Sequence, residues 1–181
     1  MEDLVERASR GDRDAFAALA SASVDRLFAI ARRILQDHDR AQDAVQSALL
    51  GARRDLPPLR DPARFQPWLR RLLVRACYEE ADKQRAFRMK VRVVTIEPAV
   101  ADSSGALADR DQLERAFRRL TVEQRSVIVL HFYLGLAMTE VSEALAIPEG
   151  TARSRLHYAL RILRGVIEAD GRWAPAEEQL A

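Results

Sequence analysis

Helical periodicity is the feature that most constrains how this chain of 181 residues can fold. Apolar residues recur three or four positions apart through most of the sequence, which gives a helix one apolar face. The 7 glycines and 7 prolines are scarce and clustered, and they separate the periodic stretches. No stretch alternates apolar and polar residues convincingly, as a half-buried strand would. The sequence therefore predicts an all-α fold.

Residues 1–88 are predicted to form an N-terminal helical bundle. Asp12 or Asp14 can cap a first long helix, which a short leading helix precedes. A second helix is expected to start near Asp39 and a third around Phe65. The motif LPPLRDP separates these two helices, because consecutive prolines cannot continue a helix.

Residues 89–108 have no helical stripe and a Ser-Ser-Gly centre, so they are predicted to form a flexible linker that contains at most a brief strand. Helical periodicity resumes over 109–170, which is predicted to be a second small helical domain, and 171–181 form a short tail. In this second domain Thr121 is expected to cap a helix, with Gln124 in the capping-box position. Thr139 is expected to cap a shorter helix, and Pro148 to start the last one.

The stretch MTEVSEALAIPEGTARSRLHYALRILRG, residues 138–165, reads as a short helix, a tight break and a longer helix. This is the helix-turn-helix pattern, whose second helix enters the major groove of DNA. One face of that helix is apolar and comprises Ala152, Leu156, Ala159, Leu160 and Leu163. The opposite face is polar and rich in arginine. An amphipathic helix with a merely solvated charged face is the alternative, but the preceding capped helix and turn favour groove insertion.

Composition favours a nucleic-acid partner and a reducing compartment. The net charge is only +2, but every basic residue except Lys83 and Lys90 is arginine, whose planar fork suits phosphates and guanine edges. A GC-rich genome would give the same bias. The single cysteine, Cys77, permits no internal disulfide and agrees with a cytoplasmic location; we expect a buried, inert thiol rather than a redox sensor. The charged N-terminus and the short apolar runs argue against a secretory signal and against membrane insertion.

The sequence offers no pattern typical of an enzyme. His38, His131 and His157 are scattered, and no cysteine or carboxylate stands beside them at metal-ligand spacing. A glycine-rich phosphate loop is also missing. We therefore expect no catalytic residues, no metal and no cofactor.

The segment LTVEQRSVIVLHFYLGLAMTEVSEALAIPEGTARSRLHYALRILR resembles the promoter-binding domain of bacterial extracytoplasmic-function (ECF) sigma factors. The segments GDRDAFAALASASVDRLFAIARRIL, DHDRAQDAVQSALLGARRDL and FQPWLRRLLVRACYEE resemble the N-terminal domain of that family, in the right order. The resemblance implies an alternative sigma factor, which is a removable subunit without catalytic residues. It would bind core RNA polymerase, direct it to promoter DNA for transcription initiation, and be a target of an anti-sigma factor.

The resemblance also implies which residues meet each partner. The C-terminal domain would read the minus-thirty-five element through Thr151, Arg153, Ser154, Arg155, His157 and Arg161. The N-terminal domain would contact the minus-ten element through Arg64, Arg70, Arg71, Arg75, Lys83 and Arg85. Core polymerase would be bound by Asp39, Asp43 and Gln46.

Two departures from the family pattern affect these expectations. Arg40, Gln42 and Ser47 stand where the family is usually acidic, so polymerase binding should depend less on charge. Ala146 stands where the turn usually has glycine, and a left-handed alanine there would cost about 1–2 kcal/mol.

Two other functions would fit part of the sequence. One is a helix-turn-helix transcriptional regulator that is not a polymerase subunit, and the other is a helical scaffold that never touches DNA. Binding to core polymerase without DNA would separate a sigma factor from the regulator, and the effect of Arg153 and Arg161 on transcription would separate it from the scaffold.

Overall fold

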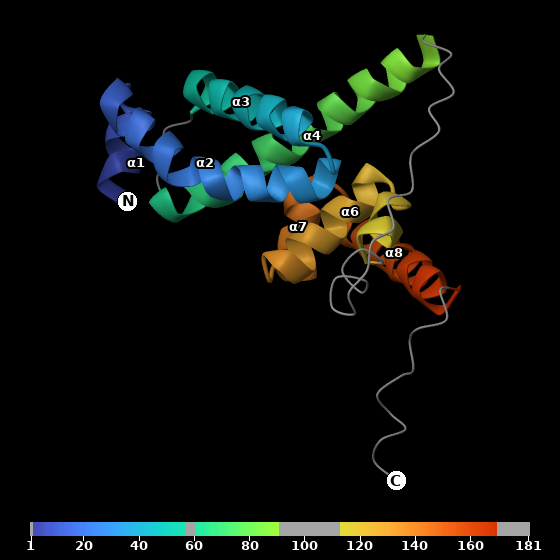
Figure 1. The fold of residues 1–181 in the computed structure, drawn as a ribbon. Coiled ribbons are helices and arrows are strands. Elements are labelled where there is room, and N and C mark those ends of the chain that lie inside the picture. Colours follow the sequence, from blue (N-terminus) through green and yellow to red (C-terminus); the bar gives the residue numbers. More distant parts are fainter. Residues whose placement is uncertain (1, 57–60, 91–112, 170–181) are drawn as a thin grey trace, which may run out of the picture.

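The computed structural model describes residues 2–56, 61–90 and 113–169. Every regular element in these three ranges is helical, which confirms the all-α fold. None of the helices in the described part is long and apolar enough to cross a membrane. The helices fall into an N-terminal and a C-terminal unit, which are in contact with each other (Figure 1).

The N-terminal unit contains α1 (Glu2–Ser9), α2 (Arg13–Leu35), α3 (His38–Asp55) and α4 (Phe65–Lys90), with a 3-10 turn η1 (Pro62–Arg64) before α4. Helix α3 packs against both α2 and α4, and α1 packs against α2 (Figure 1). The core of the unit is mostly aliphatic: Leu19, Ile30, Ile34 and Leu69 are fully buried, and Phe65 is the largest of its buried side chains.

The starts of these helices follow from side-chain caps. Asp12, and not Asp14, caps α2: its Oδ1 accepts hydrogen bonds from the backbone N–H groups of Asp14 and Ala15, both at 3.0 Å. Asp37 caps α3 in the same way, because its Oδ1 accepts from the N–H of Arg40 at 3.1 Å. The second helix therefore starts one residue before the predicted Asp39.

Helix α4 starts at Phe65 as predicted but is longer than expected. Met89 and Lys90, which the linker was expected to include, are its last two residues. The rest of the expected linker, 91–108, and the tail, 171–181, lie outside the described residues.

The C-terminal unit contains a helical segment at 113–118, α6 (Val122–Ile128), a π-helical turn η2 (Val129–Tyr133), α7 (Met138–Leu145) and α8 (Glu149–Ala169). The predicted capping box is present. Thr121 Oγ1 accepts from the N–H of Gln124 at 3.3 Å, and Gln124 Oε1 accepts from the N–H of Thr121 at 3.0 Å. Helices α7 and α8 are in contact and form the helix-turn-helix.

Three local predictions for this unit were wrong. Thr139 does not cap α7, because the N-cap is Ala137, two residues earlier, and Glu140 Oε2 accepts from the N–H of Ala137 at 2.9 Å. The single helix expected after Thr121 changes to π geometry, with Leu134 N–H donating to Val129 O at 3.1 Å. Leu160 is 41% exposed, since it lies at the edge of the apolar stripe whose centre is Ala152 and Ala159.

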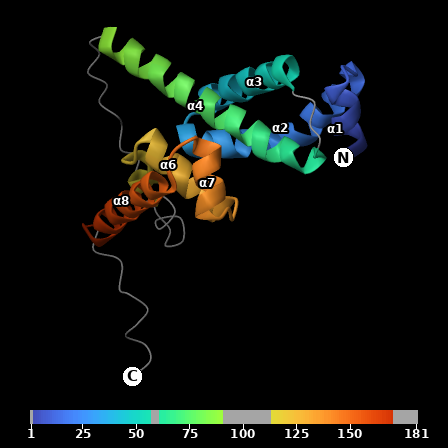
Figure 2. The same ribbon diagram turned by 180° about the vertical axis from the view of Figure 1, so that it is seen from behind.

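The two units share one continuous apolar core. Val127, Leu130 and Val141 of the C-terminal unit are fully buried in the same cluster as Leu73 of α4 and Ile34 of α2. The contacts run from α7 and α6 to α4, and from α6 and η2 to α2; Figure 2 shows α7 lying against α4. In this structure the units are therefore docked on each other and are not merely connected along the chain.

The only cysteine of the sequence lies inside this core. Cys77 on α4 has no exposed surface. Burial, with a smaller effect of the Glu80 carboxylate, raises the pKa of Cys77 to about 12. A thiol with this pKa is protonated across the physiological range, which agrees with the expected inert role.

We expect Cys77 to react very slowly with a thiol reagent such as 5,5′-dithiobis(2-nitrobenzoic acid) at pH 8. The reactive thiolate is about a thousandfold rarer at a pKa of about 12 than at the ordinary value of 9.0. The absorbance of the released thionitrobenzoate measures the rate, and protein unfolded in urea supplies the reference. Equal rates in the folded and unfolded protein would show that the thiol is accessible.

The turn of the helix-turn-helix contains a strained alanine. Ala146 ends α7 with φ 51° and ψ 46°, which is the left-handed region that favours glycine. Its backbone N–H donates to the carbonyl of Glu143 at 3.3 Å and the next residue, Ile147, donates to Ser142 O at 3.1 Å. These hydrogen bonds end the helix and fix the angle at which α8 begins.

Replacing Ala146 by glycine should raise the free energy of unfolding by about 1 kcal/mol, because the Cβ strain is removed while some unfolded-state entropy is gained. Urea unfolding followed by circular dichroism measures the change. Ala22→Gly is the matched control: Ala22 is exposed in the middle of α2, so its replacement should lower stability by about 0.5–1 kcal/mol. Equal losses in both variants would contradict the strain at Ala146.

Candidate nucleic-acid and polymerase interfaces

Helix α8 exposes the side that sequence analysis assigned to DNA. The buried residues Ala152 and Ala159 anchor the helix on α6 and α7. The predicted residues that the structure leaves exposed on the outer side are Arg153, Ser154, His157 and Arg161. Thr151 and Arg155 are only partly exposed. The arrangement resembles a recognition helix, whose apolar side packs against the domain and whose polar side is exposed.

The exposed residues of α8 are ordered by contacts within the helix. Arg153 Nε donates to Glu149 Oε1 at 2.9 Å, and Ser154 Oγ donates to Thr151 O at 3.0 Å. The guanidinium carbon of Arg161 lies 5.0 Å from the centroid of the Tyr158 ring. Sequence analysis did not assign Tyr158 to the DNA site, although an aromatic residue one turn before an arginine on the polar face was visible.

Arg155 differs from its neighbours because it faces the N-terminal unit. Its charge acts on Tyr78 of α4 and on Glu123 of α6. Burial raises the pKa of Tyr78, and the nearby Ser126 hydroxyl and Arg155 oppose this rise. Burial would also raise the pKa of Glu123, but its own backbone N–H, Thr121 and two arginines, Arg85 and Arg155, together lower it.

Helix α4 and the turn before it carry the residues predicted to meet the minus-ten element. Four of the six form an ion pair with a carboxylate one turn away, namely Arg64–Asp61 (3.8 Å), Arg75–Glu79 (3.1 Å), Lys83–Glu80 and Arg85–Asp82 (3.2 Å). Arg71 is exposed. The pairs of Arg64, Arg75 and Arg85 join exposed side chains and are weak, so these arginines remain available to a phosphate that displaces the carboxylate. The pair of Lys83 differs, because Glu80 is only 8% exposed.

Arg70 is the predicted minus-ten residue that the structure places against the C-terminal unit. It is partly buried, and its Nε has no hydrogen-bond partner among the described residues. Burial and the nearby Arg26 lower the pKa of Arg70, while Glu140 of α7 raises it. DNA therefore cannot reach the whole of this side chain in the docked arrangement.

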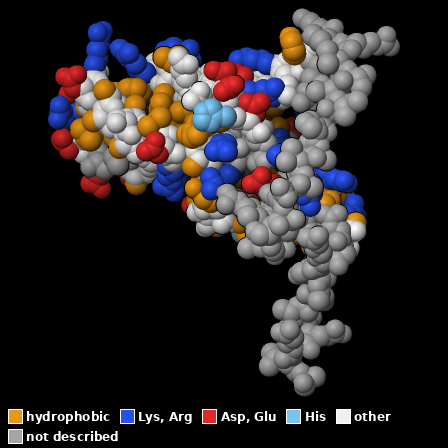
Figure 3. Space-filling model, viewed as in Figure 1, with side chains coloured by type: hydrophobic (Ala, Val, Ile, Leu, Met, Phe, Trp, Pro, Cys, Tyr) orange, Lys and Arg blue, Asp and Glu red, His pale blue; other side chains and the backbone are white. Residues whose placement is uncertain are grey.

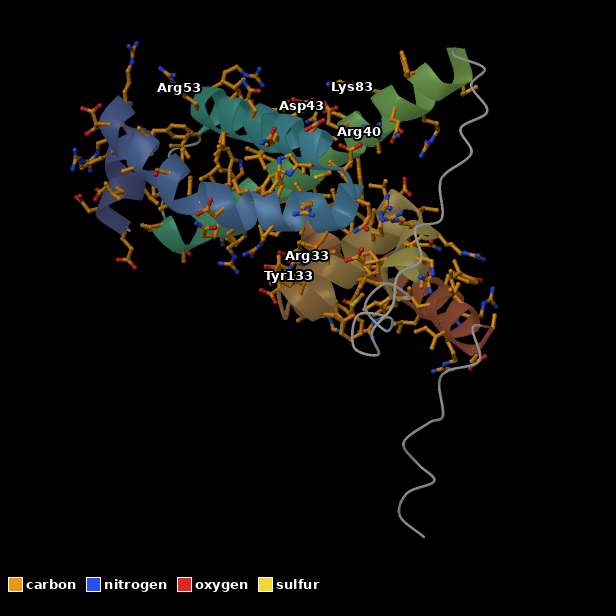
Figure 4. The ribbon with its side chains drawn as sticks, in the orientation of Figure 1. Arg33, Arg40, Asp43, Arg53, Lys83 and Tyr133 are labelled. Atoms are coloured by element: carbon orange, nitrogen blue, oxygen red, sulfur yellow. The ribbon has the colours of Figure 1, made fainter. Side chains whose placement is uncertain are left out.

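Asp39, Asp43 and Gln46 share one exposed side of α3, as their spacing predicts. Asp43 also lies near Lys83 of α4 (Figure 4). Hydrogen bonding to Glu80 is the main cause that raises the pKa of Lys83, and Asp43 contributes to the rise. The predicted polymerase surface and the predicted minus-ten surface are therefore neighbours on adjacent helices.

An apolar groove of about 730 Å³ lies beside these residues, between α2 and α3. Gln42, Gln46 and Leu50 belong to its α3 wall and Phe16 and Val24 to its α2 wall. Leu50 is 60% exposed, and Figure 3 shows the hydrophobic side chains that gather on this face. Sequence analysis did not identify the groove, although Leu50, one turn after Gln46, is an apolar residue outside the core stripe of its helix.

The part of the chain that the structure describes contains no group of His, Cys, Asp and Glu residues that could hold a metal ion. Of the histidines, His131 is bound locally, since its Nδ1 lies 2.8 Å from Leu136 O. His157 lies on the exposed side of α8, where its ring meets the edge of Tyr158.

Comparison with known proteins finds two family matches, one in each unit. The family described as Sigma-70 region 2 matches residues 19–87, and the family described as Sigma-70, region 4 matches residues 110–163. In the solved structure of the sigma factor RpoE in complex with the anti-sigma factor NepR from Bartonella quintana, the similar chain has 23% sequence identity and a TM-score of 0.67; the match covers 86% of this chain and 98% of that one. This likeness shows that the fold is the same.

Two curated relatives extend the similarity over most of the chain. The ECF RNA polymerase sigma factor SigL of Mycobacterium tuberculosis is 34% identical over 150 residues, which are 80% of this chain and 84% of the relative. The ECF RNA polymerase sigma factor SigK of Mycobacterium ulcerans is 33% identical over 174 residues, which are 92% of each chain. Because these relatives are at least 33% identical over most of the chain, and both family matches agree with them, the chain belongs to the ECF sigma factors of RNA polymerase.

Proposed function

We propose that this chain binds core RNA polymerase as a removable subunit and directs it to promoters for transcription initiation. It acts in the cytoplasm and catalyses no reaction itself. The observation that carries the proposal is the mounting of α8, which buries Ala152 and Ala159 and leaves an arginine-bearing side free for DNA. That surface stands on a different unit from the exposed side of α3, so one molecule offers separate sites to DNA and to polymerase.

Helix α3 and the groove beside it form the surface proposed for core polymerase. Asp43 and Gln46 present polar groups, and Leu50 and Val24 add apolar area next to them. A partner helix with an apolar stripe and a basic flank would satisfy both parts of this surface. This surface is partly polar and partly apolar, and an uncharged residue, Gln42, also lines the groove. Polymerase binding at this surface is therefore expected to depend less on charge.

Helix α8 is the element proposed to enter the major groove at the minus-thirty-five element. Arg153 and Arg161 can donate two parallel hydrogen bonds to a guanine edge, while Ser154 and His157 are able to contact bases or phosphates. The exposed basic residues of α4 would position the minus-ten element through its phosphates. An anti-sigma factor is a further proposed partner, because RpoE, which has the same fold, is held in such a complex.

A regulator that binds an operator on its own is the alternative that carries the same helix-turn-helix. The family relationship and the match of residues 19–87 to Sigma-70 region 2 favour the polymerase subunit. Co-purification of the chain with core polymerase in the absence of DNA is the experiment that tests the choice. A chain that binds a specific duplex tightly but never binds core polymerase would support the regulator.

Leu50→Asp should weaken binding to core polymerase about 10- to 100-fold, because a leucine buried at the interface contributes about 1.5–3 kcal/mol and a carboxylate there is desolvated. Fluorescence anisotropy of the labelled chain titrated with core polymerase measures the affinity. Leu160→Asp makes the same change at an exposed leucine of α8 and should leave this affinity unaltered. If both variants bound like the unaltered chain, the groove would not belong to the polymerase site.

Arg153→Ala and Arg161→Ala should each reduce promoter-directed transcription by core polymerase, by about 1–3 kcal/mol in promoter binding for each lost base contact. Run-off transcription on a promoter selected from a random library measures the effect. Arg10→Ala removes an exposed arginine from the turn after α1 and serves as the control. Full transcription by both α8 variants would favour a scaffold that does not read DNA.

A further inference from the structure

We propose that a pocket between the end of α2 and the first part of the C-terminal unit binds a nucleotide, with arginines for its phosphates and exposed aromatic rings for its base. The pocket is separate from the surfaces proposed for polymerase on α3 and for promoter DNA on α4 and α8. The inference goes beyond the proposed function, because it gives the chain a small ligand of its own.

The pocket has a volume of about 730 Å³, and segments far apart in the sequence form it. One wall is the last turn of α2 with the turn that follows it. The other wall is the helical segment 113–118 with the adjoining parts of α6 and η2. Small-molecule sites usually have volumes of about 300–1,000 Å³, so the pocket has room for a single nucleotide.

Three arginines border the pocket from its two walls. Arg32 and Arg33 belong to the last turn of α2, and Arg118 belongs to the opposite wall. All three are exposed, and neither Arg32 nor Arg118 is joined to a carboxylate among the described residues. A guanidinium group can donate two parallel hydrogen bonds to phosphate oxygens, so cations on both walls suit a ligand with several phosphates.

The acidic residues of the pocket are fewer, and both have partners. Asp37 caps α3 by accepting a hydrogen bond from the N–H of Arg40 at 3.1 Å, and its other oxygen lies 3.5 Å from Arg40 Nε. Glu114, the second carboxylate of the lining, also has an interaction partner. Three arginines against two occupied carboxylates leave the lining positive, which attracts a polyanion.

Exposed aromatic rings lie beside these cations. Phe132 is 60% exposed, and its ring meets that of His131 edge-on at a centroid distance of 4.8 Å. Tyr133 is 46% exposed, and the guanidinium carbon of Arg33 lies 3.9 Å from the centroid of its ring (Figure 4). Phe117 adds a third ring to the lining. Every nucleobase has a flat face that can stack on such rings.

The two kinds of group together identify the class of ligand. Inorganic phosphate would use the arginines and leave the rings uncovered, whereas an apolar molecule would cover the rings and leave the arginines unused. A nucleotide uses both, because its base and its phosphates are joined in one molecule. Since the walls of the pocket come from both units, a bound nucleotide also stabilises the folded chain.

Isothermal titration calorimetry of the full chain with ATP and with GTP, at low salt, is the test. We expect at least one of them to bind about tenfold or more tightly than its nucleoside and than inorganic triphosphate, because each of these offers only part of the chemistry. Phe132→Ala should weaken nucleotide binding about 5- to 100-fold and leave triphosphate binding unaltered, since one stacking ring is lost. Arg118→Ala should weaken the binding of both.

Arg119→Ala and Phe87→Ala are the matched controls, because each removes an exposed residue of the same type from outside the pocket lining. Both should bind nucleotide like the unaltered chain. The proposal is overturned if neither nucleotide binds, or if inorganic triphosphate binds equally well. It is also overturned if Phe132→Ala and Arg118→Ala bind like the unaltered chain.

A single-stranded thymidylate oligonucleotide is titrated in parallel. If it binds while ATP and GTP do not, the pocket belongs to nucleic acid and the proposal is overturned. Transcription with core polymerase is measured separately, without added effector. Its absence would refute the proposed function but would not affect the calorimetric result for this pocket.

Discussion

The apolar contact of α6 and α7 with α4 determines how every candidate surface is presented. Because Val127 and Val141 join the core of the N-terminal unit, the C-terminal unit has a defined place and does not merely follow the chain. That place leaves the exposed side of α3 and most of α8 open to partners. It also places Arg70 near Glu140 of α7, and Tyr78 near Arg155 of α8. The surfaces proposed for polymerase and for DNA are thus exposed to different degrees by one packing arrangement.

Local chemistry made much of the fold predictable from the sequence. Aspartate and threonine caps have a short range, so Thr121 could be assigned from its neighbours alone, and the cap of α2 could be narrowed to Asp12 or Asp14. The left-handed turn at Ala146 agrees with the glycine that the resembling family usually has at this position. The π-helical turn could not be predicted in this way, because i→i+5 hydrogen bonding is chosen by packing against the rest of the molecule. The prediction that Leu160 lies on the packed face of its helix was wrong for a related reason. The width of an apolar stripe in the sequence does not show how much of that stripe a neighbouring helix covers.

The sequence predicted which residues belong to each candidate site, but it did not predict how those residues are arranged on the surface. The helical positions of Arg153 and Arg161 follow from periodicity, and the structure leaves both exposed. Periodicity within one helix contains no information on which neighbour faces Arg70 or Arg155, since that depends on how two distant segments pack. The groove at Leu50 has walls from two helices and so appears only in three dimensions. The contacts between separate helices and between the two units could therefore not be predicted from the sequence alone.

The ion pairs along α4 affect how this protein would distinguish a promoter from the bulk of a genome. A phosphate that approaches Arg75 or Arg85 must replace the carboxylate of Glu79 or Asp82. These carboxylates would compete with each phosphate, and because an exposed ion pair is weak, the penalty for each contact would be small. A site that engages many groups at once overcomes the competition, whereas a site that offers one or two phosphates does not. Acidic residues interleaved among arginines would thereby reduce the time spent on irrelevant DNA.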